Sequence, residues 1–139
     1  MDRDQMIETL SSFTLFGGLT NPELESMVHR FEEEWVPAGQ RVVRQGFSGT
    51  GFYVILEGDA SVQIDGEERA KISRGECFGE LSVLLDEDPI ADVIATAPLR
   101  VLVLPRADLA EVITSYPEFA LRMLQLTLRR LRSASRWRP

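Results

Sequence analysis

Residues 75–85 read GECFGELSVLL, and this stretch carries the most informative fold signal in the chain. Glycine occurs at positions 75 and 79, where the backbone can adopt turns that other residues avoid. The seven residues from Gly79 to Leu85 are too few for a full helix, and they are too rich in glutamate and leucine for a strand. We therefore predict a single helical turn, opened by Gly79 and inserted among strands.

Short β-type segments surround this turn between residues 35 and 104. Glycine, proline or aspartate turns separate them about every eight to twelve residues, a spacing typical of an all-β sandwich or barrel. The dipeptide Asp65-Gly66 is a hairpin signal. The predicted strands are Gln40–Arg44, Phe52–Leu56, Ala60–Ile64, Ala70–Ser73, Asp92–Thr96 and Leu99–Leu104.

Helices are predicted before and after this β region. Residues 3–11 suit a short helix, and Thr20-Asn21-Pro22-Glu23 begins a second one that we expect to end near Glu32–Glu34. Helical spacing returns over Ala107–Thr114 and again from Pro117 to about Ser133. We expect the 139 residues to form one domain, with helices over 3–34, a barrel over 35–104 and C-terminal helices over 106–135.

A stripe of leucines runs along the last helix at intervals of three, four and three residues. Two heptads are too few to establish a coiled coil. The stripe either packs on the chain's own barrel or meets the same helix of a second subunit, and the second alternative predicts a homodimer. Its members are Leu121, Leu124, Leu128 and Leu131.

Three glycine-bearing blocks follow one another through the β region: residues 36–46, residues 52–58 and residues 75–82. With the flanking helices, these blocks resemble the cyclic nucleotide-binding domain family over roughly Phe13 to Arg130. The family includes bacterial transcription regulators, regulatory subunits of cyclic-nucleotide-dependent kinases and gated ion channels. The resemblance implies a mainly β fold, a double-stranded β-helix or jelly-roll barrel with N-terminal helices, a short cassette helix and two C-terminal helices.

The resemblance also implies a ligand-binding cassette at the predicted turn. In the family, amides at the start of a short helix face the cyclic phosphate, glycine permits the close approach, and glutamate accepts a hydrogen bond from the ribose 2′-hydroxyl. Gly79, Glu80, Leu81 and Ser82 would form this turn, and Ile90, Ala91 and Asp92 would follow as the second ligand-facing stretch. The alternative is a glycine-opened turn that only closes the barrel.

The chain departs from the family at the arginine that pairs with the phosphate. Counted from Gly79 without a gap, Pro89 takes its place, and a shift of one residue puts Ile90 there. Neither side chain can pair with a phosphate, and the preceding residues 86–88 are acidic. Loss of a bidentate arginine contact weakens binding by about 2–4 kcal/mol, or roughly 30-fold to 1000-fold. Arg74 is an alternative cation, although an arginine on a surface hairpin explains it as well.

We therefore expect a regulatory sensor module whose binding of cAMP or cGMP is weak, altered or absent, and we predict no other cofactor. Two alternatives remain open. The first is a ligand-free dimerisation or protein-interaction module that uses the last helix. The second is the sensor part of a transcription regulator whose output domain lies elsewhere, because the sequence stops at Pro139 without the helix-turn-helix that follows the long helix in such regulators. We expect no direct DNA-binding domain.

The charge is distributed unevenly along the chain. The net charge is −7, but the first 119 residues hold nine bases against 22 acids, and the remainder holds six arginines and no acid. The acidic body argues against a nucleic-acid surface on the barrel. The arginines suit either an acidic partner or a solvated helix end that complements the helix dipole. They are Arg122, Arg129, Arg130, Arg132, Arg136 and Arg138.

The remaining chemistry predicts a binding protein and not an enzyme. Cys77 is the only cysteine and is expected to be a buried thiol, and His29, the only histidine, is expected on a helix surface. The sequence shows no nucleophile motif and no cluster of metal ligands. No apolar run reaches the ~18 residues that span a bilayer, and the N-terminus lacks the pattern of a signal peptide. We expect a cytoplasmic protein with no membrane contact.

Overall fold

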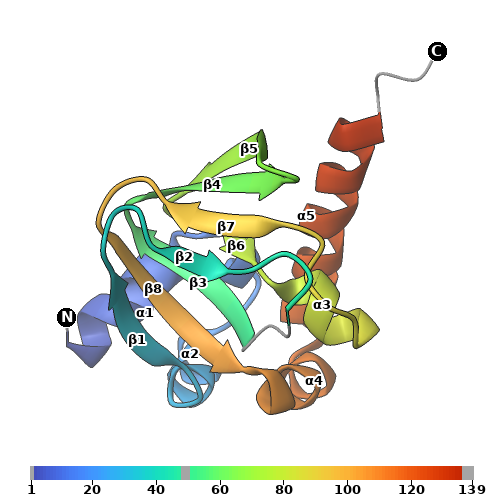
Figure 1. The fold of residues 1–139 in the computed structure, drawn as a ribbon. Helices are drawn as coiled ribbons and strands as arrows, with labels where there is room; N and C mark the ends of the chain where they lie inside the picture. The colour runs from blue at the N-terminus through green and yellow to red at the C-terminus, as the bar shows by residue number, and fades with distance from the viewer. Residues whose placement is uncertain (1, 48–50, 136–139) are drawn as a thin grey trace. The chain divides into compact units, whose positions relative to one another are not determined.

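The computed structural model describes residues 2–47 and 51–135 (Figure 1). The chain forms two compact units: one joins the described parts of residues 1–28 and 112–139, and the other comprises His29–Glu111. The elements in chain order are α1 (Arg3–Ser11), the 3₁₀ helix η1 (Thr14–Phe16), α2 (Asn21–Val28), β1 (Glu32–Val36), β2 (Arg41–Val43), β3 (Gly51–Glu57), β4 (Asp59–Ile64), β5 (Glu67–Ser73), β6 (Cys77–Phe78), α3 (Glu80–Leu85), β7 (Asp92–Ala95), β8 (Leu99–Pro105), α4 (Arg106–Ser115) and α5 (Pro117–Ser135).

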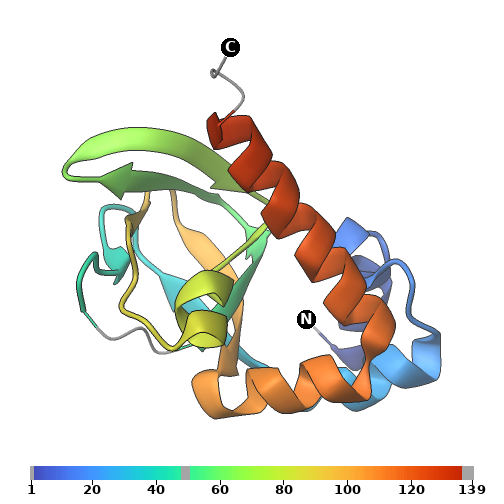
Figure 2. The same cartoon turned by 90° about the vertical axis from the view of Figure 1, so that its right-hand side faces the viewer.

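The first unit is helical, and side chains cap its helices as the sequence predicts. At the start of α2, the backbone amide of Glu23 donates to Thr20 Oγ1 at 3.3 Å, and the Glu23 carboxylate accepts from the Thr20 amide at 2.9 Å. The rings of Phe16 and Phe119, which come from η1 and α5, lie 5.5 Å apart in the core of this unit. Helix α5 continues without interruption to Ser135 (Figure 2). None of the described helices has both the length and the apolar character needed to cross a membrane.

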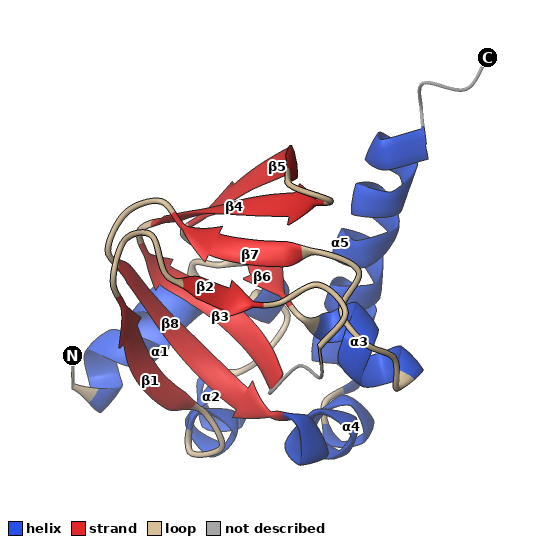
Figure 3. Cartoon of the chain, in the orientation of Figure 1, coloured by secondary structure: helices blue, strands red, loops and turns tan. Residues whose placement is uncertain are grey.

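The second unit contains every strand of the described chain, arranged as two four-stranded antiparallel sheets (Figure 3). The first sheet has the order β1-β8-β3-β6 and the second has the order β2-β7-β4-β5. Among the described residues the strand pairs form these two sheets and not one closed ring, which is the double-sheet arrangement of a jelly roll. The predicted mainly β fold and the Asp65-Gly66 hairpin are confirmed, since both residues have positive φ between β4 and β5.

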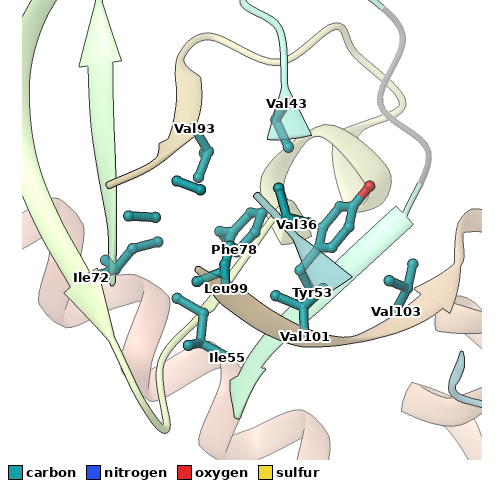
Figure 4. Packing of buried hydrophobic residues seen from close by; sticks show 12 residues of the cluster. Val36, Val43, Tyr53, Ile55, Ile72, Phe78, Val93, Leu99, Val101 and Val103 are labelled. Atoms are coloured by element: carbon teal, nitrogen blue, oxygen red, sulfur yellow. The ribbon is translucent and has the colours of Figure 1, made fainter. Parts of the chain in front are cut away.

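The core of this unit lies between the two sheets (Figure 4). Tyr53 of β3 and Phe78 of β6 stack with ring centroids 4.7 Å apart and planes 6° from parallel. Val93 and Ala95 of β7 contribute alternate side chains to the same cluster. Because successive side chains of a strand point to opposite faces, Asp92 before Val93 and Ile94 after it point away from this core.

The prediction that the second helix reaches Glu32–Glu34 is wrong. Helix α2 ends at Val28, and the three glutamates belong to β1, so the β region begins three residues earlier than residue 35. Glutamate favours a helix by intrinsic propensity. Here β1 pairs with β8 over its whole length, from Glu32 opposite Val103 to Val36 opposite Leu99, and this non-local pairing decides the backbone conformation.

Candidate functional site

The cassette turn begins at a glycine that no other residue can replace without strain. Gly79 follows β6 with φ of +93°, the left-handed region that favours glycine. A Cβ at this position would lie 2.5 Å from the carbonyl oxygen of Gly51 on β3. The tight contact between the α3 turn and β3 therefore fixes where the first amides of the helix lie.

Two polar side chains of this turn are buried. Glu80 is only 3% exposed, and the buried Ser82 hydroxyl donates to the carbonyl oxygen of Gly79 at 3.3 Å. Only one other polar side chain of the described chain, Ser61, is as well buried. Burial of a carboxylate is unfavourable unless the group forms hydrogen bonds, so Glu80 is the residue of α3 best placed for a polar role. Leu81 between them is half-buried.

The other end of α3 is held by a residue that sequence analysis missed. Arg106, the first residue of α4, donates through Nη2 to the carbonyl oxygen of Ser82 at 3.0 Å and to Asp86 Oδ1 at 2.8 Å. Asp86 ends the helix with φ of +52°. No local motif marks Arg106, because its partners lie 24 and 20 residues earlier in the chain.

The second predicted stretch does not present a cation. Pro89 is buried, and its carbonyl oxygen accepts a hydrogen bond from the Gly46 amide at 2.8 Å. Ile90 is 63% exposed, and Ala91 is half-buried. Pro89, which the ungapped count from Gly79 places opposite the family's arginine, is therefore the residue that faces inward, whereas the Ile90 side chain faces solvent.

The Asp92 carboxylate contacts other residues of this unit on the outer face of its sheet. Its Oδ1 accepts from the backbone amide of Gln45 at 2.7 Å and lies 3.8 Å from Nε of Arg41. These contacts join the start of β7 to β2 and to the segment that follows β2. Of the seven residues singled out from the sequence, the structure thus brings Gly79–Ser82 together on one turn and directs Asp92 elsewhere.

Other residues singled out from the sequence occupy ordinary structural positions. Arg74 Nη1 donates to the carbonyl oxygen of Leu56 at 3.1 Å, at the end of β3. Cys77 is buried in β6, as predicted, and His29 is exposed as predicted but lies in the turn just after α2 and not on the helix. Arg136, Trp137 and Arg138 lie outside the described residues.

Comparison with known proteins agrees with the fold described above. The family model of the cyclic nucleotide-binding domain matches residues 33–116. The cGMP-dependent protein kinase egl-4 of Caenorhabditis briggsae is 34% identical over 116 residues, a match that covers 78% of this chain and 16% of the kinase. This chain therefore spans only a small part of that kinase.

Solved structures share the fold. The catabolite activator protein of Thermus thermophilus has a TM-score of 0.78 and 31% identity, with 88% of this chain and 60% of that chain covered. A regulatory subunit of a cAMP-independent protein kinase A from Trypanosoma brucei has a TM-score of 0.69 and 23% identity, with 89% and 51% covered, and shows likeness of fold alone. The family match, the two sheets and the Gly79 turn lead to one conclusion: this chain belongs to the cyclic nucleotide-binding domain family.

Proposed function

We propose that this chain is a regulatory domain that keeps the cassette turn of its family but binds cAMP and cGMP weakly or not at all. The observation that carries the proposal is the pair Pro89 and Ile90, one buried and one exposed, where the family has its phosphate-binding arginine. A proline side chain offers no charge and no hydrogen-bond donor to an incoming phosphate.

The charges around the cassette support the same proposal. Residues 86–88 after α3 are all acidic and exposed. Arg106, the arginine seen at this end of the helix, already holds Asp86 and the Ser82 carbonyl group. At α3 an anionic ligand therefore meets a negative local field, and the arginine seen there is already engaged, so we expect its affinity to be lower by roughly 30-fold to 1000-fold.

A pair of neighbouring arginine substitutions tests the proposal. Calorimetric titration with cAMP and with cGMP should give weak or undetectable binding to the native chain. Pro89→Arg should raise the affinity at least about tenfold, because its guanidinium replaces a side chain that faces inward. Ile90→Arg is the matched control, since it adds the same charge one residue away on a side chain that faces solvent, and it should change the affinity little.

Two results would contradict this proposal. Submicromolar binding of either nucleotide by the native chain would show that the missing arginine is replaced by another group. Equal gains for Pro89→Arg and Ile90→Arg would show that added charge alone raises the affinity, and that the inward position of residue 89 is unimportant.

A second candidate function, a homodimerisation module, is favoured by the leucine stripe of α5. Phe119 and Met123 of this helix are buried, whereas the four stripe leucines are 49–54% exposed. Contiguous exposed leucines suit a protein interface, and a second copy of the same helix is the occupant we propose. We further propose a cytoplasmic location, no catalytic activity in this domain and an acidic partner for the arginines of α5.

A further inference from the structure

Strand β1 is an exposed edge of the first sheet. Among the described residues it pairs with β8 alone, so alternate backbone groups along its other side have no partner strand. Its first four residues, Glu32 to Trp35, are all exposed, and only Val36 enters the core. An edge with this degree of exposure is open to pairing with another strand.

Trp35 is a large, exposed aromatic side chain on this edge. It is 60% exposed, and the guanidinium of Arg100 on β8 lies 5.5 Å from the centre of its ring. Arg100 is itself only 11% exposed and lies within 3.4 Å of Glu33 and 4.0 Å of Glu57. The indole therefore lies against a cation on one side and presents most of its surface to solvent, where a partner side chain can pack on it.

The charge of this surface is mainly negative. Glu33 and Glu57 lie beside Arg100, and Glu32 and Glu34 point to the other side of the strand from Trp35, so this edge carries four carboxylates against the one guanidinium of Arg100. One of the two edge strands of the other sheet, β5, is different. It carries Glu67 and Glu68 beside Arg69 and Lys71, with no aromatic residue. Mixed charges suffice to protect an edge from aggregation, so the uniform acidity and the tryptophan of β1 call for another explanation.

We propose that the β1 edge is a docking site for a basic, extended segment of a partner protein, which adds to the sheet as a fifth strand. Main-chain hydrogen bonds to the free edge would supply part of the affinity. Lysine or arginine side chains would face Glu32 and Glu34 on one side of the strand, and apolar side chains would pack on Trp35 on the other. The carboxylates select a cationic partner by charge complementarity. This inference is independent of ligand binding at α3.

A synthetic peptide of three Lys-Val repeats, capped at both ends and labelled with a fluorophore, provides the probe. Its fluorescence anisotropy should rise on titration with the full chain and the apparent affinity should fall as salt is added. The matched peptide of three Glu-Val repeats should not bind. In the Trp137→Phe background, the emission of Trp35 should shift to shorter wavelength when the Lys-Val peptide binds.

Three variants locate the site. Trp35→Ala should weaken peptide binding at least about tenfold. Glu34→Gln, which removes one carboxylate without touching the Arg100 contacts, should weaken it about two- to fivefold. Glu67→Gln on β5 is the matched control, since it removes one carboxylate from the other edge, and it should leave the affinity unchanged. Circular dichroism of each variant checks that the fold is retained.

Backbone pairing is tested by methylating peptide nitrogens. Two methylated Lys-Val peptides are compared, one N-methylated on every lysine and the other on every valine. They should bind with different affinities, because only one of them has lost the amides that face β1. Binding of both methylated peptides as tightly as the parent would overturn strand addition. Binding of the Glu-Val peptide, absence of Lys-Val binding at low salt, or equal losses for Glu34→Gln and Glu67→Gln would overturn the proposed site.

Discussion

Gly79 shows how one residue sets the geometry of the cassette. Its φ of +93° and the nearby carbonyl oxygen of Gly51 leave no room for a side chain. We predict that Gly79→Ala destabilises the protein by about 2–4 kcal/mol, from the left-handed backbone and the displacement of β3 together. The free energy of unfolding is measured by urea denaturation followed by circular dichroism.

Gly66→Ala is the control for this prediction, because it separates the two effects. Gly66 has φ of +81°, but a Cβ added there would meet no atom within 4 Å, so its substitution carries the backbone penalty alone, about 1 kcal/mol. If the two variants lose the same stability, the contact between Gly79 and Gly51 contributes nothing.

At the scale of single residues, sequence patterns predicted the glycines better than the charged side chains. A glycine turn has a local cause, so Gly79 and Asp65-Gly66 were predictable from their neighbours. The contact of Asp92 with the Gln45 amide joins residues 47 positions apart, and no local pattern indicates it. The family resemblance placed Asp92 near the ligand, whereas strand alternation with Val93 directs its carboxylate away from the core.

At the scale of elements, the helices were predicted where their ends are marked by capping residues. The start of α2 is an example, since Thr20 and Glu23 cap it reciprocally. Strand β1 was missed because its three glutamates carry no strand signal of their own. The partner that makes it a strand, β8, lies about seventy residues later, as the pairing of Glu32 with Val103 shows.

The stability of α3 as an element depends on Arg106. Because this arginine donates to the Ser82 carbonyl group and to Asp86, we predict that Arg106→Met exposes the helix to local unfolding. Amide hydrogen exchange over residues 80–86 should accelerate about tenfold or more, as expected for the loss of a charged hydrogen bond to a partly buried carbonyl group. Exchange is measured by mass spectrometry of peptic peptides.

Asp86→Asn removes the exposed ion pair with Arg106 and leaves the hydrogen bond from Arg106 to the Ser82 carbonyl group in place. Asparagine also tolerates positive φ, so the turn at residue 86 is kept while the ion pair is lost. The Asp86 side chain is 94% exposed, and an exposed ion pair contributes little to stability. The rate of amide exchange over residues 80–86 should therefore change about threefold or less. Equal acceleration in both variants would show that the Ser82 carbonyl contact does not stabilise α3.

At the scale of the whole molecule, the chain combines a helical unit with a β unit, and the exposed surfaces of each suggest different partners. The β unit offers the acidic β1 edge, and the helical unit offers the leucine stripe and the arginines of α5. The sequence left open whether the stripe packs inward or meets a second subunit. We propose the second subunit, because the four leucines are half-exposed beside the buried Phe119 and Met123.

We predict that the native chain self-associates through this stripe. Light scattering coupled to size-exclusion chromatography, over a range of protein concentrations, should show a mass that rises from monomer to dimer. The double variant Leu124→Lys and Leu128→Lys should raise the dimer dissociation constant at least about a hundredfold, because each lysine removes apolar burial and the two copies together bring four added positive charges into one contact. Gln125→Lys with Ser133→Lys adds the same two charges at exposed polar positions of the same helix, and it should dimerise like the native chain. A native mass that stays monomeric at every concentration, or an equal loss in this control, would exclude the leucine stripe as the dimer interface.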